Sequence, residues 1–482
     1  MRPLLRLAAA FALLLGASVP ASAQPAETRM EAILSALRPT VEIAGRTYEK
    51  RSLAELMREK KVPAVSIALI EDGRLVWSRA YGMADVAAGR PATTRTLFQA
   101  ASISKPLAAT GALALVQSGK LWLDRPVNAQ LSHWRIPEND FTKASPVTLR
   151  HLLTHTGGLT VHGFPGYRAG APLPSVPQIL DGIAPANTEA VRVDQAPGSA
   201  WRYSGGGFTV LQLLMTEVAN QPFPDLMDRL VLRPLGMRRS TFRQPLPAQR
   251  ASESATGYGE DGSALPGASH VYPEIAAAGL WTTPSDLAKW ALAISAAHNG
   301  AGRGPLSPET AREMLKPGKG DWGLGFHVSG EGPLLRFSHG GANAGFRSDL
   351  MMFPRRGDGL VIMTNGDNGG AVMGAVIQAV GRARGWPNSE PRKIAVAQVP
   401  RESLEAVVGR YADPAVSVNV RLDGGVPTFS LQGGPPMEIV PQGEDVFIVA
   451  DMQLEIRFGR DPATGRVVSV SGAGVTLPRV PN

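Results

Sequence analysis

The sequence predicts an α/β protein with an antiparallel sheet flanked by helices, an all-helical lobe, and a small antiparallel β domain at the end. Three observations support this prediction. Strand-like apolar runs lie near both ends of residues 53–385, helical patterns fill the stretch between them, and beyond residue 403 short alternating runs are separated by glycine-containing turns. Because strands from both ends would share one sheet, the intervening helices are expected to form a separate lobe.

The first strands are expected to form a hairpin. Residues 65–70 and 75–77 are apolar runs, and Asp72-Gly73 lies between them. An Asp-Gly pair between two such runs is a strong hairpin signal. Residues 24–52 precede this domain as a leader and a first amphipathic helix, with one apolar face formed by Met30, Ile33, Leu34 and Leu37.

Helical periodicity dominates the middle of the chain. Apolar residues recur at helical spacing from Lys105 to Ser118, and Gly119 ends that run. Further helical segments are expected at 148–153, 208–219, 224–232 and 284–297. Strand character returns at 323–328, 347–353 and 360–364, and a last helix is expected at 371–384.

The C-terminal part differs in composition. Residues 386–403 contain Pro387, Pro391 and Pro400 among polar residues and are interpreted as a linker. Residues 404–482 are then expected to form the antiparallel β domain, with strand-like runs at 416–422, 428–431, 446–449, 453–458 and 467–470.

Composition excludes several classes of protein. The 482 residues carry a formal charge of +8, but the basic residues are scattered and aromatic residues make up only 6%. A nucleic-acid surface would need clustered basic residues, so no nucleic-acid partner is expected. No segment is long and apolar enough to predict a permanent membrane span.

Residues 1–23 resemble a secretory signal peptide. Arg2 and Arg6 precede a short apolar stretch, and Ala21-Ser22-Ala23 forms a small-residue cleavage site. The absence of cysteine is compatible with an oxidising compartment. A periplasmic or secreted protein is therefore expected.

The first candidate catalytic pair is Ser102 and Lys105. Pro106 lacks an N–H group, so it is expected in the first turn of the following helix, with Ser102 at the start of that helix. Residues three apart share a helix face, which places the lysine beside the serine. A desolvated lysine has an accessible neutral form that can take the hydroxyl proton.

Two other segments offer partners for this pair. Tyr203 precedes Gly205-Gly-Gly207 and an apolar helix, and its phenol could carry a proton, although a core tyrosine at a capped helix start is the alternative. His339 precedes Gly340 and Gly341, which allow close approach of the backbone to a ligand and would let the Ala342 N–H group point at an oxyanion. The alternative there is a glycine-rich turn with a surface histidine.

A zinc site is disfavoured. His151, His155 and His162 lie close in sequence, but Thr154-His-Thr-Gly-Gly-Leu159 breaks any helix that would present them together. No cysteine or acidic cluster accompanies them, so neither a metal nor another cofactor is expected.

Taken in order, these motifs resemble the serine β-lactamase and penicillin-binding-protein superfamily. The matching segments are Ser102-x-x-Lys105, Leu152-Leu-Thr-His-Thr-Gly-Gly-Leu159, Tyr203-Ser-Gly205, Ala276-Ala-Ala-Gly-Leu-Trp-Thr-Thr283 and His339-Gly-Gly341. The chain is most similar to the class C-related branch of esterases, D-aminopeptidases and D-Ala-D-Ala carboxypeptidases. The resemblance implies a β-lactamase/transpeptidase-like fold over about residues 53–385, with the active site between the two lobes.

The resemblance also implies roles for single residues. Ser102 would be the acylated nucleophile and would contribute one oxyanion N–H, Lys105 would accept its proton, and Tyr203 would share the acid–base work. His339 would take the place of the lysine in the third motif, and Ala342 would give the second oxyanion N–H. Whether Lys105 or Tyr203 is the base in each step stays open.

Two departures from the family pattern affect specificity. Gly205 stands where the family usually has an asparagine that holds the substrate's amide side chain, and His339 replaces a permanent cation and would be only partly charged near neutral pH. Both changes weaken recognition of β-lactams and peptidyl carboxylates.

The resulting hypothesis is an exported serine hydrolase that forms a Ser102 acyl-enzyme with ester or amide substrates. The alternatives are a peptidase or carboxypeptidase specific for D-amino acids, a β-lactamase, and, from another class, a catalytically weak protein that binds peptidoglycan or another ligand. The expected partner is a small ester, amide or peptide.

Overall fold

The structure is a computed structural model that describes residues 25–481 apart from 303, 414–415, 432–435, 451–453 and 473–474. Residues 1–23, which we expected to be a signal peptide, lie outside these residues. Among the residues described, no helix is long and apolar enough to cross a membrane.

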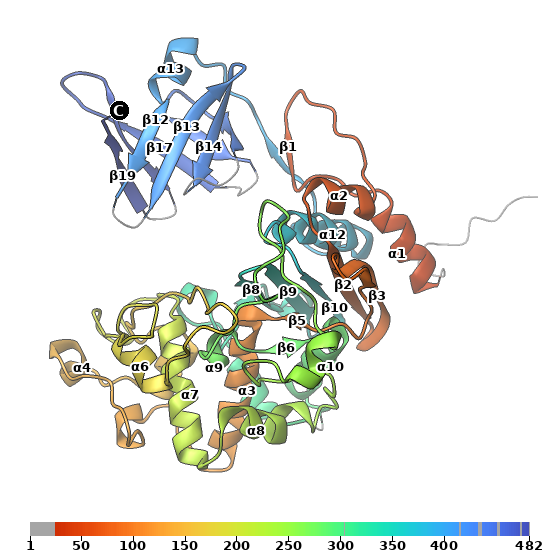
Figure 1. Ribbon diagram of the computed structural model, residues 1–482, viewed down its shortest axis with the longest axis vertical. Coiled ribbons are helices and arrows are strands. Elements are labelled where there is room, and N and C mark those ends of the chain that lie inside the picture. The colour runs from red at the N-terminus through yellow and green to blue at the C-terminus, as the bar shows by residue number, and fades with distance from the viewer. Residues whose placement is uncertain are drawn as a thin grey trace, which may run out of the picture.

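A seven-stranded antiparallel sheet forms the centre of the larger domain (Figure 1). Its order is β4-β3-β2-β10-β9-β8-β7, so the predicted N-terminal hairpin pairs directly with the late strands, with Ile67 opposite Ile362. The strands are β2 (Ala64–Glu71), β3 (Arg74–Asp85), β4 (Arg90–Pro91), β7 (His327–Ser329), β8 (Arg336–Asn343), β9 (Phe346–Phe353) and β10 (Asp358–Thr364). The sequence analysis did not predict β8.

Both faces of this sheet are covered, which explains the continuous apolar runs in β2 and β10. Along β2, Val65, Ile67 and Leu69 join one apolar core, whereas Ala64 and Ala68 join another. Three helices contribute to the first core: α1 (Ala26–Leu34), α2 (Leu53–Glu59) and α12 (Gly369–Arg384). The helix α1, which we expected in a leader before this domain, therefore packs in the same apolar core as the sheet.

The other face of the sheet meets α10, α3 and the helical lobe. The helices on this side are α3 (Ser104–Gln117), α4 (Asp140–Ala144), α5 (Leu149–Leu153), α6 (Val176–Asp181), α7 (Gly205–Ala219), α8 (Phe223–Met227), α9 (Ile275–Ala278), α10 (Pro284–His298) and α11 (Pro308–Met314). A π-helical turn, Asp228–Leu232, follows α8. A short pair, β5 (Phe98–Gln99) with β6 (Trp281–Thr282), lies between sheet and lobe. The lobe predicted from the periodicity is thus confirmed.

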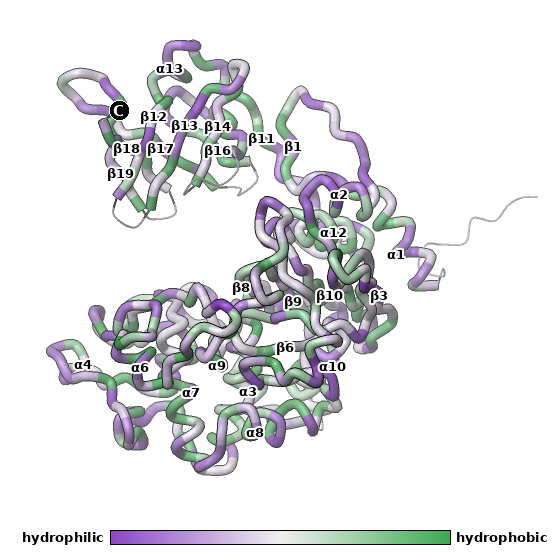
Figure 2. The backbone as a smooth tube through the Cα atoms, in the orientation of Figure 1, coloured by the Kyte–Doolittle hydropathy of each residue, from purple (hydrophilic) through white to green (hydrophobic). Residues whose placement is uncertain are grey.

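The C-terminal domain is a closed antiparallel barrel of eight strands. They are β12 (Gly409–Ala412), β13 (Ser417–Asp423), β14 (Val426–Leu431), β15 (Met437–Pro441), β16 (Val446–Val449), β17 (Leu454–Arg460), β18 (Val467–Gly472) and β19 (Val475–Val480). Five of these were predicted, and β12, β15 and β19 were not. The strands mix hydrophilic and hydrophobic residues, as expected when one face lines a core (Figure 2).

The segment expected to be a linker has regular structure of its own. It contains β11 (Arg392–Ile394), which pairs in parallel with β1 (Val41–Ile43), and the first residues of α13 (Arg401–Ala406). The β1–β11 pair packs on Val440 and Ile448 of the barrel. The Arg46 guanidinium donates two hydrogen bonds, of 2.7 and 2.5 Å, to the Glu438 carboxylate. The N-terminal segment therefore holds the barrel against the rest of the chain.

Candidate active site

Ser102 lies in a strained turn at the start of α3. It belongs to the 3₁₀ helix Ala101–Ile103, and Ala101 has a φ of 49°. A non-glycine residue in this left-handed region costs about 1–3 kcal/mol and persists only when its surroundings hold it. The Ser348 hydroxyl donates to the Ala100 carbonyl at 2.8 Å, and the Ser104 hydroxyl donates to the Ala101 carbonyl at 2.6 Å. These bonds fix the turn that presents Ser102.

Lys105 lies one helical turn from Ser102, as the sequence predicted. Its Nζ atom is 3.0 Å from Ser102 Oγ and donates to the Ala277 carbonyl of α9 at 2.9 Å. The residue is only 2% exposed, and burial lowers the pKa of the amine from 10.5 to about 7. Desolvation disfavours the charged form, so the neutral amine is well populated near pH 7.

Tyr203 completes a three-residue contact. The Ser102 side chain is near enough to influence the pKa of the Tyr203 phenol, and Lys105 Nζ lies 4.9 Å from the centre of its ring. Burial raises the pKa of Tyr203 far above its usual value of 10, so the phenol keeps its proton at any physiological pH. The next residue, Ser204, caps α7, because its hydroxyl accepts the Gly207 N–H at 2.9 Å.

His339 lies near this group but is not partly charged, so that expectation was wrong. The residue is 5% exposed on β8, and its ring centre is 6.1 Å from that of Tyr203. Burial and the nearby Lys105 amine lower the pKa of His339 to about 3. Its Nδ1 atom is 2.6 Å from the Gly340 carbonyl, which can only accept a hydrogen bond, so Nδ1 carries a proton, and the lowered pKa makes the ring neutral near pH 7.

The two glycines of the third motif lie in a strand and not in a turn. A Cβ atom on Gly341 would be 2.2 Å from the Ala100 carbonyl oxygen, so β8 passes the Ser102 turn at a distance that only glycine allows. Gly340 and Ala342 lie on the opposite face of β8 and are exposed. The close approach that Gly341 permits is thus to the Ser102 turn, whereas the sequence led us to expect an approach to a ligand.

Gly205, the departure in the second motif, is covered by an aromatic ring. A Cβ atom there would be 2.9 Å from Phe164 Cε2 and 3.1 Å from the His162 carbonyl oxygen. Phe164 therefore occupies the space into which a side chain at position 205 would project. Sequence reasoning did not find Phe164, because the contact joins positions 41 residues apart and no motif marks it.

Other contributors were also missed. The Trp322 ring lies edge-on to Tyr203 at 5.7 Å and to His339 at 5.5 Å, and His155 packs on Tyr203. Nothing in the sequence around Asp321-Trp-Gly323 indicated that Trp322 belongs to the site. His155 was considered only as a metal ligand, and no group of three side chains able to hold a metal ion occurs among the described residues.

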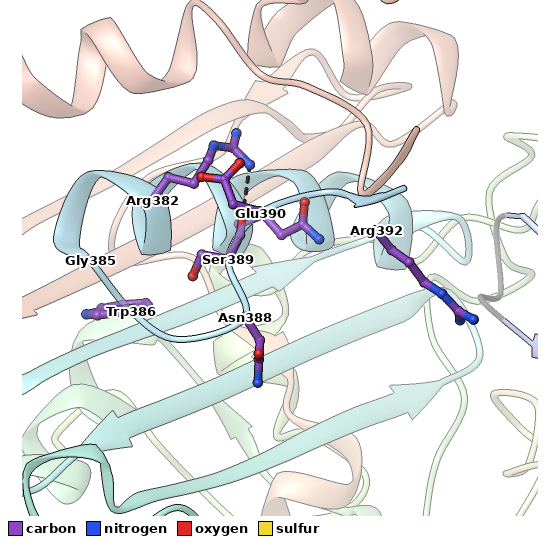
Figure 3. Close-up of a pocket in the computed structure, with 8 residues that line it drawn as sticks. Arg382, Gly385, Trp386, Asn388, Ser389, Glu390 and Arg392 are labelled. Carbon is purple, nitrogen blue, oxygen red and sulfur yellow. Dashed lines mark hydrogen bonds between the residues drawn. The ribbon is translucent and has the colours of Figure 1, made fainter. Parts of the chain in front are cut away.

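A surface cavity of about 610 Å³ beyond α12 contains none of the predicted site residues (Figure 3). It is lined by residues of segment 378–392, where Arg382 donates to the Ser389 carbonyl at 3.1 Å. Arg392 points away from Arg382, so the two guanidinium groups do not converge on one ligand position. This cavity therefore lies apart from the predicted site residues.

The fold and this geometry define a class. An antiparallel sheet with an all-helical lobe, and a serine–lysine pair at the start of the first lobe helix, are typical of serine hydrolases in which a lysine lies beside the nucleophile.

The comparisons with known proteins give the family. The sequence model of the beta-lactamase family matches residues 50–382, and the chain belongs to that family. It is 34% identical to esterase EstB of Burkholderia gladioli over 206 residues, which are 41% of this chain and about half (51%) of EstB. It is 27% identical to the putative penicillin-binding protein PbpX of Bacillus subtilis over 319 residues, 64% of this chain and 72% of PbpX.

A solved structure shares the whole architecture. The octameric penicillin-binding protein homologue from Pyrococcus abyssi superposes with a TM-score of 0.58 at 22% identity, covering 89% of this chain and 97% of the other. At this identity the likeness shows the fold alone. It confirms the predicted fold class, and the family match confirms the prediction of a serine hydrolase.

The buried amine predicts a pH dependence of stability. Between about pH 7 and 10.5 the unfolded chain holds a proton on Lys105 that the folded chain has lost. Stability therefore rises with pH in this window, with a slope approaching about 1.4 kcal/mol per pH unit. We expect the free energy of unfolding of the wild type, relative to Lys105→Met, to rise from pH 7 to 10 in urea titrations. The exposed Lys120→Met is the control, and its free energy of unfolding should change with pH as that of the wild type does. The same pH dependence in Lys105→Met and the wild type would contradict the lowered pKa of Lys105.

Proposed function

We propose that this protein is an exported esterase that transfers the acyl group of neutral esters to Ser102 and then to water. The observation that carries the proposal is the 3.0 Å contact between Ser102 Oγ and the buried amine of Lys105, whose pKa is about 7. A general base is most effective when its pKa lies near the working pH. Export is supported by the signal-like residues 1–23.

Acylation begins with the neutral amine of Lys105. As Ser102 Oγ attacks the ester carbonyl carbon, the amine takes the hydroxyl proton and a tetrahedral oxyanion forms. The N–H groups of Ser102 and Ala342 stabilise this oxyanion, and the close passage of β8 at Gly341 supports this role. Collapse breaks the bond to the alcohol, which leaves with a proton that returns from Lys105 through the Tyr203 phenol.

Deacylation reverses the direction of the protons. Water attacks the acyl-enzyme carbonyl, Lys105 accepts a proton from this water, and the second oxyanion collapses to release the acid and regenerate the Ser102 hydroxyl. Tyr203 acts in both steps as a hydrogen-bond donor and relay, because its raised pKa keeps the phenol protonated. Lys105 is therefore the base in both half-reactions.

The electrostatics of the site favour neutral substrates. His339 is neutral, so position 339 offers no cation for a substrate carboxylate. Phe164 covers Gly205, where the related enzymes usually hold a substrate amide. Both features favour esters over D-amino-acid peptides and β-lactams, and the similarity to an esterase agrees with this choice. A pure binding protein would have no use for an amine with a pKa matched to proton transfer.

The first test addresses the nucleophile. A fluorophosphonate probe should label the wild type, and Ser102→Ala should abolish both labelling and p-nitrophenyl acetate turnover, because the hydroxyl that forms the covalent bond is gone. The exposed Ser199→Ala is the control and should keep both activities. Labelling that persists in Ser102→Ala would show that Ser102 is not the nucleophile.

The second test addresses the base. Since only the neutral amine accepts the proton, kcat/KM for an ester should rise with pH through about 7 and then remain level to pH 9. The Tyr203 phenol adds no descending limb in this range, because it stays protonated. Initial rates from pH 5.5 to 9, corrected for spontaneous hydrolysis, measure this profile, and a flat profile would exclude Lys105 as the base.

The third test addresses specificity. Gly205→Asn alone should slow ester hydrolysis, because its Cβ atom meets the Phe164 ring at 2.9 Å. In the Phe164→Ala/Gly205→Asn double variant the amide side chain has room, and the ratio of kcat/KM for D-Ala-p-nitroanilide to that for p-nitrophenyl butyrate should rise about tenfold. Phe164→Ala alone is the control. An unchanged ratio in the double variant would show that Phe164 does not decide substrate choice.

A further inference from the structure

His155 lies in the loop after α5 and binds the backbone on both sides of Tyr203. It is 2% exposed and has a φ of 55°. Its carbonyl oxygen accepts the Arg202 N–H at 2.8 Å, and its Nδ1 atom accepts the Ser204 N–H at 3.1 Å. The two residues that flank the tyrosine in sequence are thus both fixed by one histidine.

The same histidine also contacts the tyrosine side chain. The ring centres of His155 and Tyr203 are 4.2 Å apart with 32° between the planes. On its other sides the Tyr203 ring meets His162 at 5.0 Å and the edge of Trp322 at 5.7 Å. Backbone bonds and ring contacts together determine where the phenol oxygen lies relative to Ser102.

The hydrogen bond to Ser204 also determines the state of the imidazole. A backbone N–H can only donate, so Nδ1 of His155 carries no proton and the ring is neutral. Burial agrees with this, because it lowers the pKa of His155 well below the usual value. His155 therefore supplies an acceptor and an aromatic face, and neither of these changes over the working pH range.

We propose that His155 is a positioning residue that holds Tyr203 against Ser102. This proposal rests on the proposed function, because it assigns His155 a role in the Ser102 reaction. It differs from a purely structural role, in which His155 would stabilise the helical lobe without acting through the tyrosine. A positioning residue is expected to affect kcat more than KM, because it acts on the transition-state geometry of the reacting groups.

Three variants separate the acceptor from the ring. An asparagine side chain at this position places an amide oxygen close to the position of Nδ1 and tolerates the left-handed backbone, so His155→Asn should retain kcat within about tenfold of the wild type. His155→Gln places its polar group too far along the side chain, and His155→Phe keeps a ring without an acceptor. Both should lower kcat for p-nitrophenyl butyrate by about 30- to 100-fold, with KM changed less than about threefold.

The deciding measurement combines these variants with Tyr203→Phe. If His155 acts through the phenol, the effect of His155→Gln or His155→Phe on kcat should vanish when Tyr203 is already replaced by phenylalanine. An equal effect in both backgrounds would overturn the proposal, as would a loss in His155→Asn as large as that in His155→Gln. If His155→Phe does not fold, the comparison with Tyr203→Phe is made with His155→Gln alone. The concentration of folded enzyme is measured by fluorophosphonate titration.

Two controls keep this test apart from the proposed function. His151→Phe changes a histidine one turn earlier, whose Nδ1 atom accepts the Thr148 N–H at 3.3 Å, and it should leave kcat within about twofold of the wild type. Ser102→Ala should be inactive. Turnover that survives in Ser102→Ala would contradict the proposed function, whereas additive effects of positions 155 and 203 in an enzyme that depends on Ser102 would contradict only the positioning role.

Discussion

The amine of Lys105 lies out of water between the hydroxyl of Ser102 and the carbonyl oxygen of Ala277. Moving a charged amine to such a place is costly, and the amine relieves that cost by losing its proton more readily. The same burial that would destabilise a charged lysine therefore makes it a base near neutral pH. Every other part of the site depends on this placement, since among the described side chains only the Lys105 amine is hydrogen-bonded to Ser102 Oγ.

The fold explains how that burial is achieved. The site draws on the start of α3, on α9, on the segment before α7, and on β8, which are far apart in sequence. They meet because the N-terminal hairpin pairs with β10, which joins the strands before and after the inserted helices in one sheet. Asn343 at the end of β8 donates to the Ala278 carbonyl at 3.1 Å, so the strand also holds the short helix that binds the Lys105 amine.

The sequence was informative where a local rule determines geometry. Spacing alone placed Lys105 beside Ser102. It failed where tertiary burial decides the outcome. The ordinary pKa of histidine suggested partial charge at position 339, but burial beside another amine leaves the ring neutral. Phe164 covers Gly205 through a contact that no spacing rule predicts, and β12, β15 and β19 become strands by closing the barrel.

The neutral ring at position 339 also bears on how the base is tuned. The Lys105 amine lowers the pKa of His339, so the two positions are close enough to interact electrostatically. A permanent cation there would disfavour the ammonium form of Lys105 and lower its pKa further, which would weaken it as a base. With a neutral histidine, burial alone sets the pKa of Lys105 at about 7. A neutral His339 offers no charge to bind a substrate carboxylate, but it leaves the Lys105 amine basic enough to accept the serine proton. This combination suits a site that acts on uncharged esters.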